Sequence, residues 1–587
     1  MNAEWSLDVL FSGFDDPAYK KTLETLEQGI RKFERHADSL QDVKEADVAK
    51  ACKDALLLME EITVAFEELT VYASLRCEAN TRDAEANAQL GKLYQVGADE
   101  SVPETKFKEF VAGIKDLDAV IEQDEILKEY SYMLHNIQRD SKYLLSAEVE
   151  MVLSKTQEYA GNAWTKQQSY LTSTVAVEFE GKKETLSSIR NKAYADDKEI
   201  RKKAYEAELA AYDKIKDAVS FSLNSIKMQN ITETKLRGFE SPIERTLYES
   251  RMKRSTLDAM FEAIDEYLPK FHAYLKAKAA KLGYTKGLPW YELFAPMGKE
   301  GKKFTAEEAG DYLVKNFASF DTDLSDMIKK AFDEAWIDFY PREGKVGGAF
   351  CAELNSKKQS RILTNFDGTF GDVVTLAHEL GHAFHNVNLF EHRPLNHELA
   401  MQLAETASTF NENVITQAAI EQAQDKEEKM HLVENQLQDL TQVICDIYSR
   451  YLFETEVFEK RADQFLYADD LCEIMLNAQK KAYGDGLDHE LLHPYMWICK
   501  GHYYSAGLSF YNFPYAFGAL FARGLFVKYQ TEGKPFVEQY RKMLHMTTVM
   551  DIEEAAAVAG IDITDKSFWK SSLQSVSEEI DSFLEMC

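Results

Sequence analysis

Apolar residues along most of the chain recur with the period of an α-helix. Between Leu257 and Leu275 they return every three or four positions, with Pro269 inside the pattern. This spacing places them on one side of a helix, so it predicts a helix that buries one side and bends at the proline. Similar patterns occupy most of residues 17–255 and 425–587. We therefore predict a mainly α protein.

Two segments depart from the helical period. Residues 175–179 alternate apolar and polar side chains ahead of a turn at Gly181, which predicts a small hairpin. Residues 346–366 contain glycines followed by short apolar runs, and they predict a few strands just before a histidine-rich helix. Clusters of proline and glycine at 101–106 and 283–302 predict connections between lobes.

The length of the chain predicts more than one lobe. Its 587 residues exceed what a single hydrophobic core usually holds, so we expect two or more lobes that share a cleft. An N-terminal helical region is expected over residues 1–110, and a helical region with the hairpin over residues 111–200, as part of the N-terminal lobe. We expect residues 201–587 to form a further domain that contains the motif described below.

Composition restricts the class of function. The chain has 99 acidic and 68 basic residues, a net charge of -31, which argues against nucleic acid as a partner because phosphate recognition needs clustered lysine and arginine. No run of eighteen apolar residues occurs, and the N-terminus lacks a basic stretch followed by an apolar one, which argues against a membrane or secreted protein. Seven scattered cysteines without a CxxC pair favour reduced thiols. We predict a cytoplasmic protein.

The stretch VVTLAHELGHAFHNVNL, residues 373–389, carries candidate metal chemistry. Asp372 is expected to cap a helix on which His378 and His382, four residues apart, point the same way. Glu379 is rotated from His378 by about a third of a turn, so it is better placed to act on a water molecule than to bind the metal itself. This HExxH arrangement predicts two zinc ligands and a glutamate general base.

The third ligand is expected from a following helix. In the pattern HExxHxxGxxH, positions 385 and 388 would be glycine and histidine, but they are His385 and Asn388, so that pattern fails. His385 is expected in the core or behind the ligands, with direct metal binding as the alternative. A second helix is expected to start near Asn396 and to supply a carboxylate ligand.

Three glutamates, Glu398, Glu405 and Glu412, recur at seven-residue spacing on that second helix and so share a face. We predict Glu405 as the ligand, because the small residues Ala404 and Ala407 beside it would allow the helices to approach closely. The site would then be His2Glu with one coordination position open. Glu412 is expected to orient a ligand imidazole, although the spacing fits an exposed surface carboxylate equally well.

These motifs together resemble a known family. HELGHAFH at 378–385 followed by ETASTFNE at 405–412 resembles the zinc site of the thimet oligopeptidase and oligoendopeptidase F family, and is most similar to oligoendopeptidase F. Further blocks resemble the family in the same order, at residues 237–250, 288–296, 344–351 and 501–518. The resemblance implies a clam-like, two-lobed helical metallopeptidase with a deep central channel, a catalytic domain over residues 201–587, and short unstructured oligopeptides as substrates.

The resemblance also assigns roles at the predicted metal site. It implies one zinc ion per chain, bound by His378, His382 and Glu405, with Glu379 as the catalytic general base. These four assignments agree with those made from the residues alone. Zinc is inferred from the ligand types, since a His2Glu set accepts other divalent ions.

The downstream block at 501–518 implies donors for the oxyanion of the transition state. His502, Tyr511 and Tyr515 carry over from the family, and neutral imidazole or phenol groups are suited to that task. Where some members have another tyrosine, this chain has Gly518, which leaves open how the roles divide among these tyrosines and Tyr504. We predict that Tyr504 contacts the substrate.

Residues 360–366, SRILTNF, are expected to form an edge strand that pairs with an extended peptide. Ala349 and Cys351 would lie beside this strand and are predicted to bind substrate. The sequence thus predicts a zinc endopeptidase that acts on oligopeptides. A metallo-carboxypeptidase of related fold and a catalytically silent peptide-binding protein are the alternatives. The sequence gives no indication of the oligomeric state.

Overall fold

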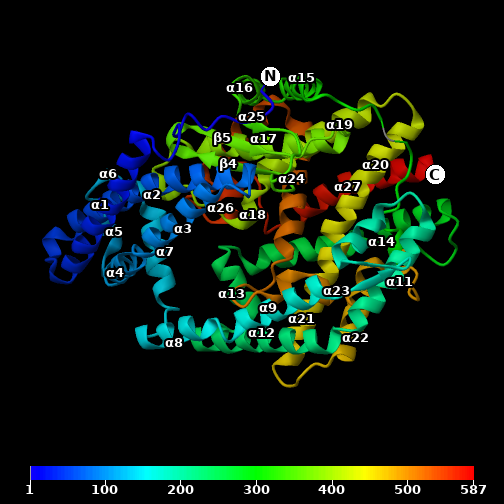
Figure 1. Cartoon of the computed structure of the whole chain (residues 1–587), viewed down its shortest axis with the longest axis horizontal. Helices are drawn as coiled ribbons and strands as arrows, with labels where there is room; N and C mark the ends of the chain where they lie inside the picture. The colour runs from blue at the N-terminus through cyan, green and yellow to red at the C-terminus, as the bar shows by residue number, and fades with distance from the viewer. Residues whose placement is uncertain (1, 300) are drawn as a thin grey trace. The chain divides into compact units, whose positions relative to one another are not determined.

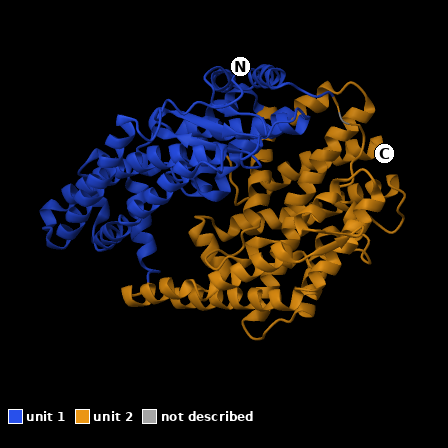
Figure 2. Cartoon of the chain, viewed as in Figure 1, with its two compact units in different colours: residues 1–144, 302–415, 532–560 blue, residues 145–301, 416–531, 561–587 orange. Residues whose placement is uncertain are grey.

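A computed structural model describes residues 2–299 and 301–587, and the chain divides into two compact units (Figure 2). Unit 1 comprises residues 1–144, 302–415 and 532–560, and unit 2 comprises residues 145–301, 416–531 and 561–587. Helices dominate both units and strands are few, so the predicted fold class is confirmed. The three-part division predicted above stays a prediction, as does a channel.

Unit 1 begins with a helical bundle whose core is continuous with a strand of its sheet. In the first helix the apolar residues Leu26, Ile30 and Phe33 recur at helical spacing and are at most 5% exposed. They join a buried cluster that extends to Leu354. The helices of this unit are α1 (Pro17–Ser39), α2 (Val48–Ala79), α3 (Ala84–Ala98), α4 (Ser101–Ala112), α5 (Leu117–Ile121), α6 (Glu125–Glu129), α7 (Ser131–Ser141), α15 (Ala306–Phe317), α16 (Thr322–Asp333), α17 (Phe370–Leu389), α18 (Met401–Ala404), the first part of α19 (Thr406–Gln422), α25 (Lys534–Met546) and α26 (Ile552–Val558). The last seven residues of α19, from Thr416, belong to unit 2.

A three-stranded sheet precedes α17, as predicted from residues 346–366. Its strands are β3 (Ile337–Asp338), β4 (Phe350–Leu354) and β5 (Gln359–Leu363), in the order β3-β5-β4. The pairing of β4 with β5 is antiparallel and that of β3 with β5 is parallel. In Figure 1, α17 lies along β4 and β5, which it packs against.

The prediction that residues 360–366 form an edge strand is wrong. Strand β5 holds most of residues 360–366, but it lies in the middle of the sheet because the two-residue strand β3 pairs with its second side. Within the described residues β4 pairs on one side only, so β4 is the free edge. Successive side chains of β4 point to opposite faces of the sheet. Those of Phe350, Ala352 and Leu354 pack on the bundle core, so those of Cys351 and Glu353 lie on the other face.

Unit 2 is a helical assembly with one hairpin, formed by β1 (Val177–Phe179) and β2 (Lys182–Glu184). This hairpin confirms the one predicted from the alternation at residues 175–179. Helix α14 confirms the predicted helix around Pro269. The helices of this unit are α8 (Ala147–Gln157), α9 (Gly161–Thr174), α10 (Leu186–Asn191), α11 (Lys198–Asp213), α12 (Lys216–Arg237), α13 (Pro242–Glu249), α14 (Arg254–Lys281), α20 (Lys426–Thr441), α21 (Ile447–Arg461), α22 (Ala468–Tyr483), α23 (Met496–Cys499), α24 (Phe513–Glu532) and α27 (Lys566–Met586).

Two further expectations bear on the chain as a whole. All seven cysteines are free thiols, as the absence of paired motifs predicted. Among the described residues, none of the helices combines the length and the apolar character that crossing a bilayer requires.

Candidate metal centre

Helix α17 carries the HExxH motif and begins earlier than predicted. Thr369, rather than Asp372, is the N-cap: its hydroxyl accepts from the Asp372 amide at 3.2 Å, while the Asp372 carboxylate accepts from the Thr369 amide at 2.9 Å. The reciprocal bonds form a capping box, which needs Asp372 inside the first turn. His378 and His382 then fall in the middle of a 20-residue helix.

The helix that follows is interrupted where a continuous helix from Asn396 was predicted. A short helix, α18, starts at Met401, and Glu405 lies in a turn between it and α19. Glu405 thus stands just before the N-terminus of α19, where the helix dipole favours a negative charge. Ser408 holds its carboxylate by donating to Oε2 at 2.8 Å. Glu398 lies ahead of α18, so it does not share a helix face with Glu405.

Close contact between α17 and α19 brings the ligands together. A Cβ atom added to Gly381 would stand 2.5 Å from the Cα of Ser408 and 2.6 Å from the carbonyl oxygen of Ala407, so the helix backbones touch at this glycine. A hydrogen bond also joins the two helices: the Asn411 side chain of α19 donates at 3.1 Å to the carbonyl of Ala377, which precedes Gly381 by four residues on α17. The small residue between the two histidines therefore sets the distance between the helices.

Three side-chain atoms from these helices form a nearly equilateral triangle. His378 Nε2 and His382 Nε2 are 3.2 Å apart, and each is 3.3 Å from Glu405 Oε2. No second group of three such side chains converges in this way among the described residues. The structure therefore brings together the three residues predicted as ligands.

The triangle fits a divalent metal ion. Ligand atoms about 2.0 to 2.1 Å from a tetrahedral zinc ion stand about 3.3 Å apart, which matches all three edges. Two imidazole nitrogens and one carboxylate oxygen are also the donor types of open zinc sites. The His378 Nδ1 is hydrogen-bonded to Glu412, so the ring can donate there and keep its Nε2 lone pair for the metal.

Charges around the triangle shift several pKa values. Burial opposes a charge on His378, but the hydrogen bond and charge of Glu412 outweigh it and raise the pKa of His378 to about 9. Burial also opposes ionisation of Glu405, but the nearby imidazoles lower the pKa of this carboxyl to about 2. An excess of negative charge thus surrounds the two histidines, which favours a bound cation.

The Glu412 carboxylate is expected to strengthen metal binding through its hydrogen bond to His378. Replacing it by glutamine keeps an acceptor for His378 but removes the charge, and such changes behind a ligand typically weaken metal binding about 10- to 100-fold. We expect that loss for Glu412→Gln in competition titrations with a chromophoric chelator. Glu421→Gln, at an exposed position near the end of the same helix, is the control. Equal affinities for the two variants would contradict a role of the Glu412 charge in metal binding.

Glu379 lies beside the triangle and is 5% exposed. Burial raises the pKa of its carboxyl, although the charges of His378 and His382 oppose the shift. Within the described residues no hydrogen bond holds this carboxylate, so it can accept a proton from a water molecule.

His385 points away from the triangle. It is 1% exposed and its Nε2 is 2.9 Å from the Thr547 hydroxyl oxygen, and burial lowers its pKa to about 3. These contacts place the ring in the core between α17 and the segment after α25, in line with the expected core position.

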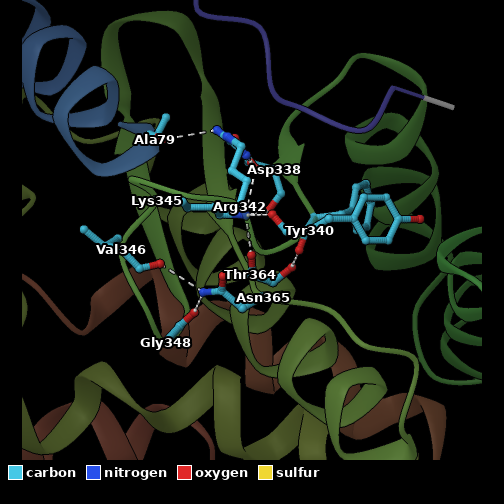
Figure 3. A network of polar contacts seen from close by, with 10 residues as sticks. Ala79, Asp338, Tyr340, Arg342, Lys345, Val346, Gly348, Thr364 and Asn365 are labelled. Atoms are coloured by element: carbon cyan, nitrogen blue, oxygen red, sulfur yellow. Dashed lines mark hydrogen bonds and ion pairs between the residues drawn. The ribbon is translucent and has the colours of Figure 1, made fainter. Parts of the chain in front are cut away.

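A polar network holds the segment that leads into the free strand edge (Figure 3). Lys345, whose side chain is buried, donates to Asp338 Oδ1 at 2.7 Å and to the Tyr340 carbonyl at 3.0 Å. The Asn365 amide donates to the carbonyls of Val346 and Gly348 at 3.0 and 2.8 Å. The network ties residues 340–348 to β3 and to the chain after β5, so it fixes where β4 begins.

Two of the three residues predicted to bind substrate lie at this edge. Ala349 directly precedes β4, and Cys351 pairs with Ile362 of β5. Burial raises the pKa of the Cys351 thiol well above its usual range, with a further contribution from the charge of Glu379. The thiol therefore lies near the candidate general base, and its role in substrate binding stays a prediction.

The residues from the downstream block belong to unit 2. Their rings cluster there: the His502 centroid is 5.0 Å from that of Tyr511 and 5.9 Å from that of Tyr515. Burial and the charges of Arg450 and Lys500 lower the pKa of His502, which favours a neutral imidazole that can donate a hydrogen bond. The structure thus brings together the three residues assigned to the oxyanion.

Tyr504 differs from its neighbours. It is 0% exposed, it belongs to the buried core of unit 2, and its hydroxyl donates to the Trp497 carbonyl at 2.9 Å. A fully buried ring with a satisfied hydroxyl has no group left for a ligand, so this arrangement does not support the substrate-binding role predicted for Tyr504.

Sequence reasoning missed Gly381 and Ser408. Both act through the close contact of α17 with α19: one permits the approach and the other holds the Glu405 carboxylate. The signal for Gly381 was present, because a glycine lies between the two histidines and small residues lie on the helix expected to face it. Its meaning depends on which helices cross, which spacing alone does not give.

Comparisons with known proteins find peptidase relatives over most of the chain. The model of peptidase family M3 matches residues 192–575, and the model described as oligopeptidase F matches residues 112–175. Oligopeptidase PepF of Bacillus subtilis is 23% identical, with 99% of this chain and 87% of the relative covered. Oligoendopeptidase F (chromosomal) of Lactococcus lactis is 25% identical, with 88% and 85% covered.

Solved structures share the fold. A Chlamydophila abortus protein whose description proposes a peptidase superposes with a TM-score of 0.84 at 19% identity, over 100% of this chain and 98% of the other. Oligoendopeptidase F from Enterococcus faecium superposes with a TM-score of 0.70 at 19% identity, over 97% and 98% of the two chains.

Proposed function

The chain belongs to peptidase family M3, and on that premise we propose that it is a zinc-dependent endopeptidase that cleaves internal bonds of short, unstructured oligopeptides. The observation that carries the proposal is the triangle of His378, His382 and Glu405, whose edges of 3.2 to 3.3 Å suit a tetrahedral zinc ion. The two similar proteins named oligoendopeptidase F, from Lactococcus lactis and Enterococcus faecium, support internal cleavage. We place the enzyme in the cytoplasm.

The three triangle residues would hold one zinc ion per chain, and Glu412 would orient His378. When bound, zinc supplies Lewis acidity, which polarises a peptide carbonyl and acidifies water. The same nitrogen and oxygen donors can bind other divalent metal ions, so the identity of the metal as zinc is part of the proposal.

Glu379 is the proposed general base. Its carboxylate removes a proton from the attacking water and then delivers that proton to the leaving amine. The raised pKa of Glu379 suits both steps, because a carboxyl whose pKa lies nearer to neutral holds the proton long enough to pass it on. Among the described residues no side chain or backbone group forms a hydrogen bond with the Glu379 carboxylate, so the carboxylate is available to the water.

Two further groups of residues complete the proposal. The edge of β4, with Ala349 and Cys351, would pair with an extended peptide through backbone hydrogen bonds, which accept many side chains. His502 and Tyr511 or Tyr515 would donate hydrogen bonds to the oxyanion as the peptide bond is attacked.

The experiment that tests this function is mass analysis of products from a library of unstructured peptides of graded length. We expect internal fragments, loss of cleavage after chelation, and recovery when one equivalent of zinc per chain is returned. The Glu379→Gln protein, purified in the same way, is the control for contaminating peptidases.

Other outcomes would favour the alternatives. Release of single C-terminal residues without internal fragments would indicate a metallo-carboxypeptidase. Peptide binding without any cleavage by the zinc-loaded protein would indicate a silent binding protein. Cleavage that survives removal of all metal would contradict the proposed role of the triangle.

A further inference from the structure

A buried ion pair lies beneath the loop that carries Tyr511. Lys227 of α12 and Glu454 of α21 have side-chain exposures of 0% and 2%, and Lys227 Nζ is 2.6 Å from Glu454 Oε1. An ion pair removed from water is often no more stabilising than apolar side chains of the same volume, so stability alone does not account for it. The contacts of the Glu454 carboxylate indicate another role.

Glu454 accepts hydrogen bonds from both neighbours of Tyr511. The Phe510 amide donates to Oε1 at 3.1 Å, and the Asn512 side chain donates to Oε2 at 2.7 Å. Phe510 has a φ of 56°, in the left-handed region that a phenylalanine adopts only where its surroundings hold it. One carboxylate thus fixes the strained backbone before Tyr511 and the side chain after it.

Side chains of α12 and α13 bind the earlier part of the loop, residues 505–509. Asn230 of α12 donates to the Ser509 hydroxyl at 3.1 Å, and Thr246 of α13 donates to the Ser509 carbonyl at 3.1 Å. These bonds anchor the approach to Tyr511, whereas Glu454 acts on the residues directly beside it. Disturbing Glu454 should therefore loosen Tyr511 while the rest of the loop stays anchored.

We propose that Glu454, with its charge balanced by Lys227, is a positioning residue that sets the direction of Tyr511 beside His502. The inference rests on the proposed function, in which these two rings donate to the oxyanion. Oxyanion donors act only from about 2.7 to 3.1 Å, so a loosened tyrosine stabilises the transition state less without altering how the ground-state peptide binds. The effect should fall on kcat and spare KM.

Glu454→Gln tests the inference through its coupling to Tyr511→Phe. In the otherwise wild-type enzyme we expect kcat to fall roughly 10- to 100-fold, with KM within about twofold and zinc content unchanged. In the Tyr511→Phe background the same change should lower kcat by less than about twofold, because the hydroxyl that it positions is already absent. Equal factors in the two backgrounds would overturn the inference.

The same unit offers a matched control. Lys278 and Glu434 form another ion pair with 0% exposure of both side chains, and Glu434 also accepts from Tyr274 at 2.9 Å. Glu434→Gln should cost similar stability and leave kcat unchanged. Hydrogen exchange of the Phe510 amide gives a readout without activity: it should speed up in Glu454→Gln and not in Glu434→Gln. Unchanged exchange in Glu454→Gln would overturn the inference.

The remaining outcomes separate this inference from the proposed function. If Glu454→Gln does not fold, Asn512→Ala leaves the ion pair intact and must show the same dependence on the Tyr511 hydroxyl. Cleavage that continues unimpaired in Tyr511→Phe would overturn the inference and leave the peptidase proposal standing. Absence of any cleavage by the zinc-loaded wild-type protein would instead remove the proposed function itself.

Discussion

Glu379→Gln is expected to lower kcat for peptide hydrolysis by roughly 10²- to 10⁴-fold, the range that a positioned general base contributes. Glutamine has nearly the same shape but cannot take a proton from water. Because Glu379 is not one of the three triangle residues, the variant should still bind about one zinc per chain. Turnover of a quenched fluorescent peptide, with metal content measured by elemental analysis on the same sample, checks both expectations.

Two companion variants define the result for Glu379. Glu405→Ala should lose both activity and zinc, because it removes one corner of the ligand triangle. Glu398→Gln, in the segment ahead of α18, should retain both. A Glu379→Gln enzyme that keeps full turnover would exclude the general-base role, and one that loses its zinc would make Glu379 part of the metal-binding set.

Gly381→Ala is expected to destabilise unit 1 and to weaken metal binding together. The added methyl would meet the Ser408 Cα at 2.5 Å and the Ala407 carbonyl oxygen at 2.6 Å, which are backbone atoms that cannot rotate away. Overpacking of this kind costs about 1 to 3 kcal/mol, occasionally more, and we expect about 3 kcal/mol because relief requires the helices to separate. Separation moves Glu405 away from both histidines.

Metal binding should report that movement, because ligand distances tolerate only about 0.2 Å. We expect zinc affinity to fall at least about tenfold, measured by chelator competition, alongside a lower midpoint in urea. Gly371→Ala on the same helix is the control: its Cβ would lie 3.5 Å from Thr369 Oγ1, an ordinary contact. There alanine should be neutral or slightly stabilising, since it favours helix more than glycine does by up to about 1 kcal/mol. Equal behaviour of both variants would contradict the close helix contact.

The sequence determined what depends on local spacing. Four residues bring a helix back to nearly the same face, so His378 and His382 had to point together once the segment was helical. The same reasoning identified the hairpin at residues 177–184 and the mainly helical class. Seven-residue spacing also singled out Glu405 and Glu412. That spacing assumed one continuous helix, whereas Glu405 lies in a turn between α18 and α19.

What required the tertiary structure was each contact between segments far apart in the chain. Strand β5 lies inside the sheet because the two residues of β3 pair with it, and so short a strand leaves no pattern to detect. Burial of Tyr504 likewise follows from the packing of unit 2. The need for glycine at 381 exists only because Ala407 and Ser408 cross it. Helical and strand periods follow from bonds within a segment, whereas an edge, a crossing point or a metal triangle depends on which distant segments the packed core brings together.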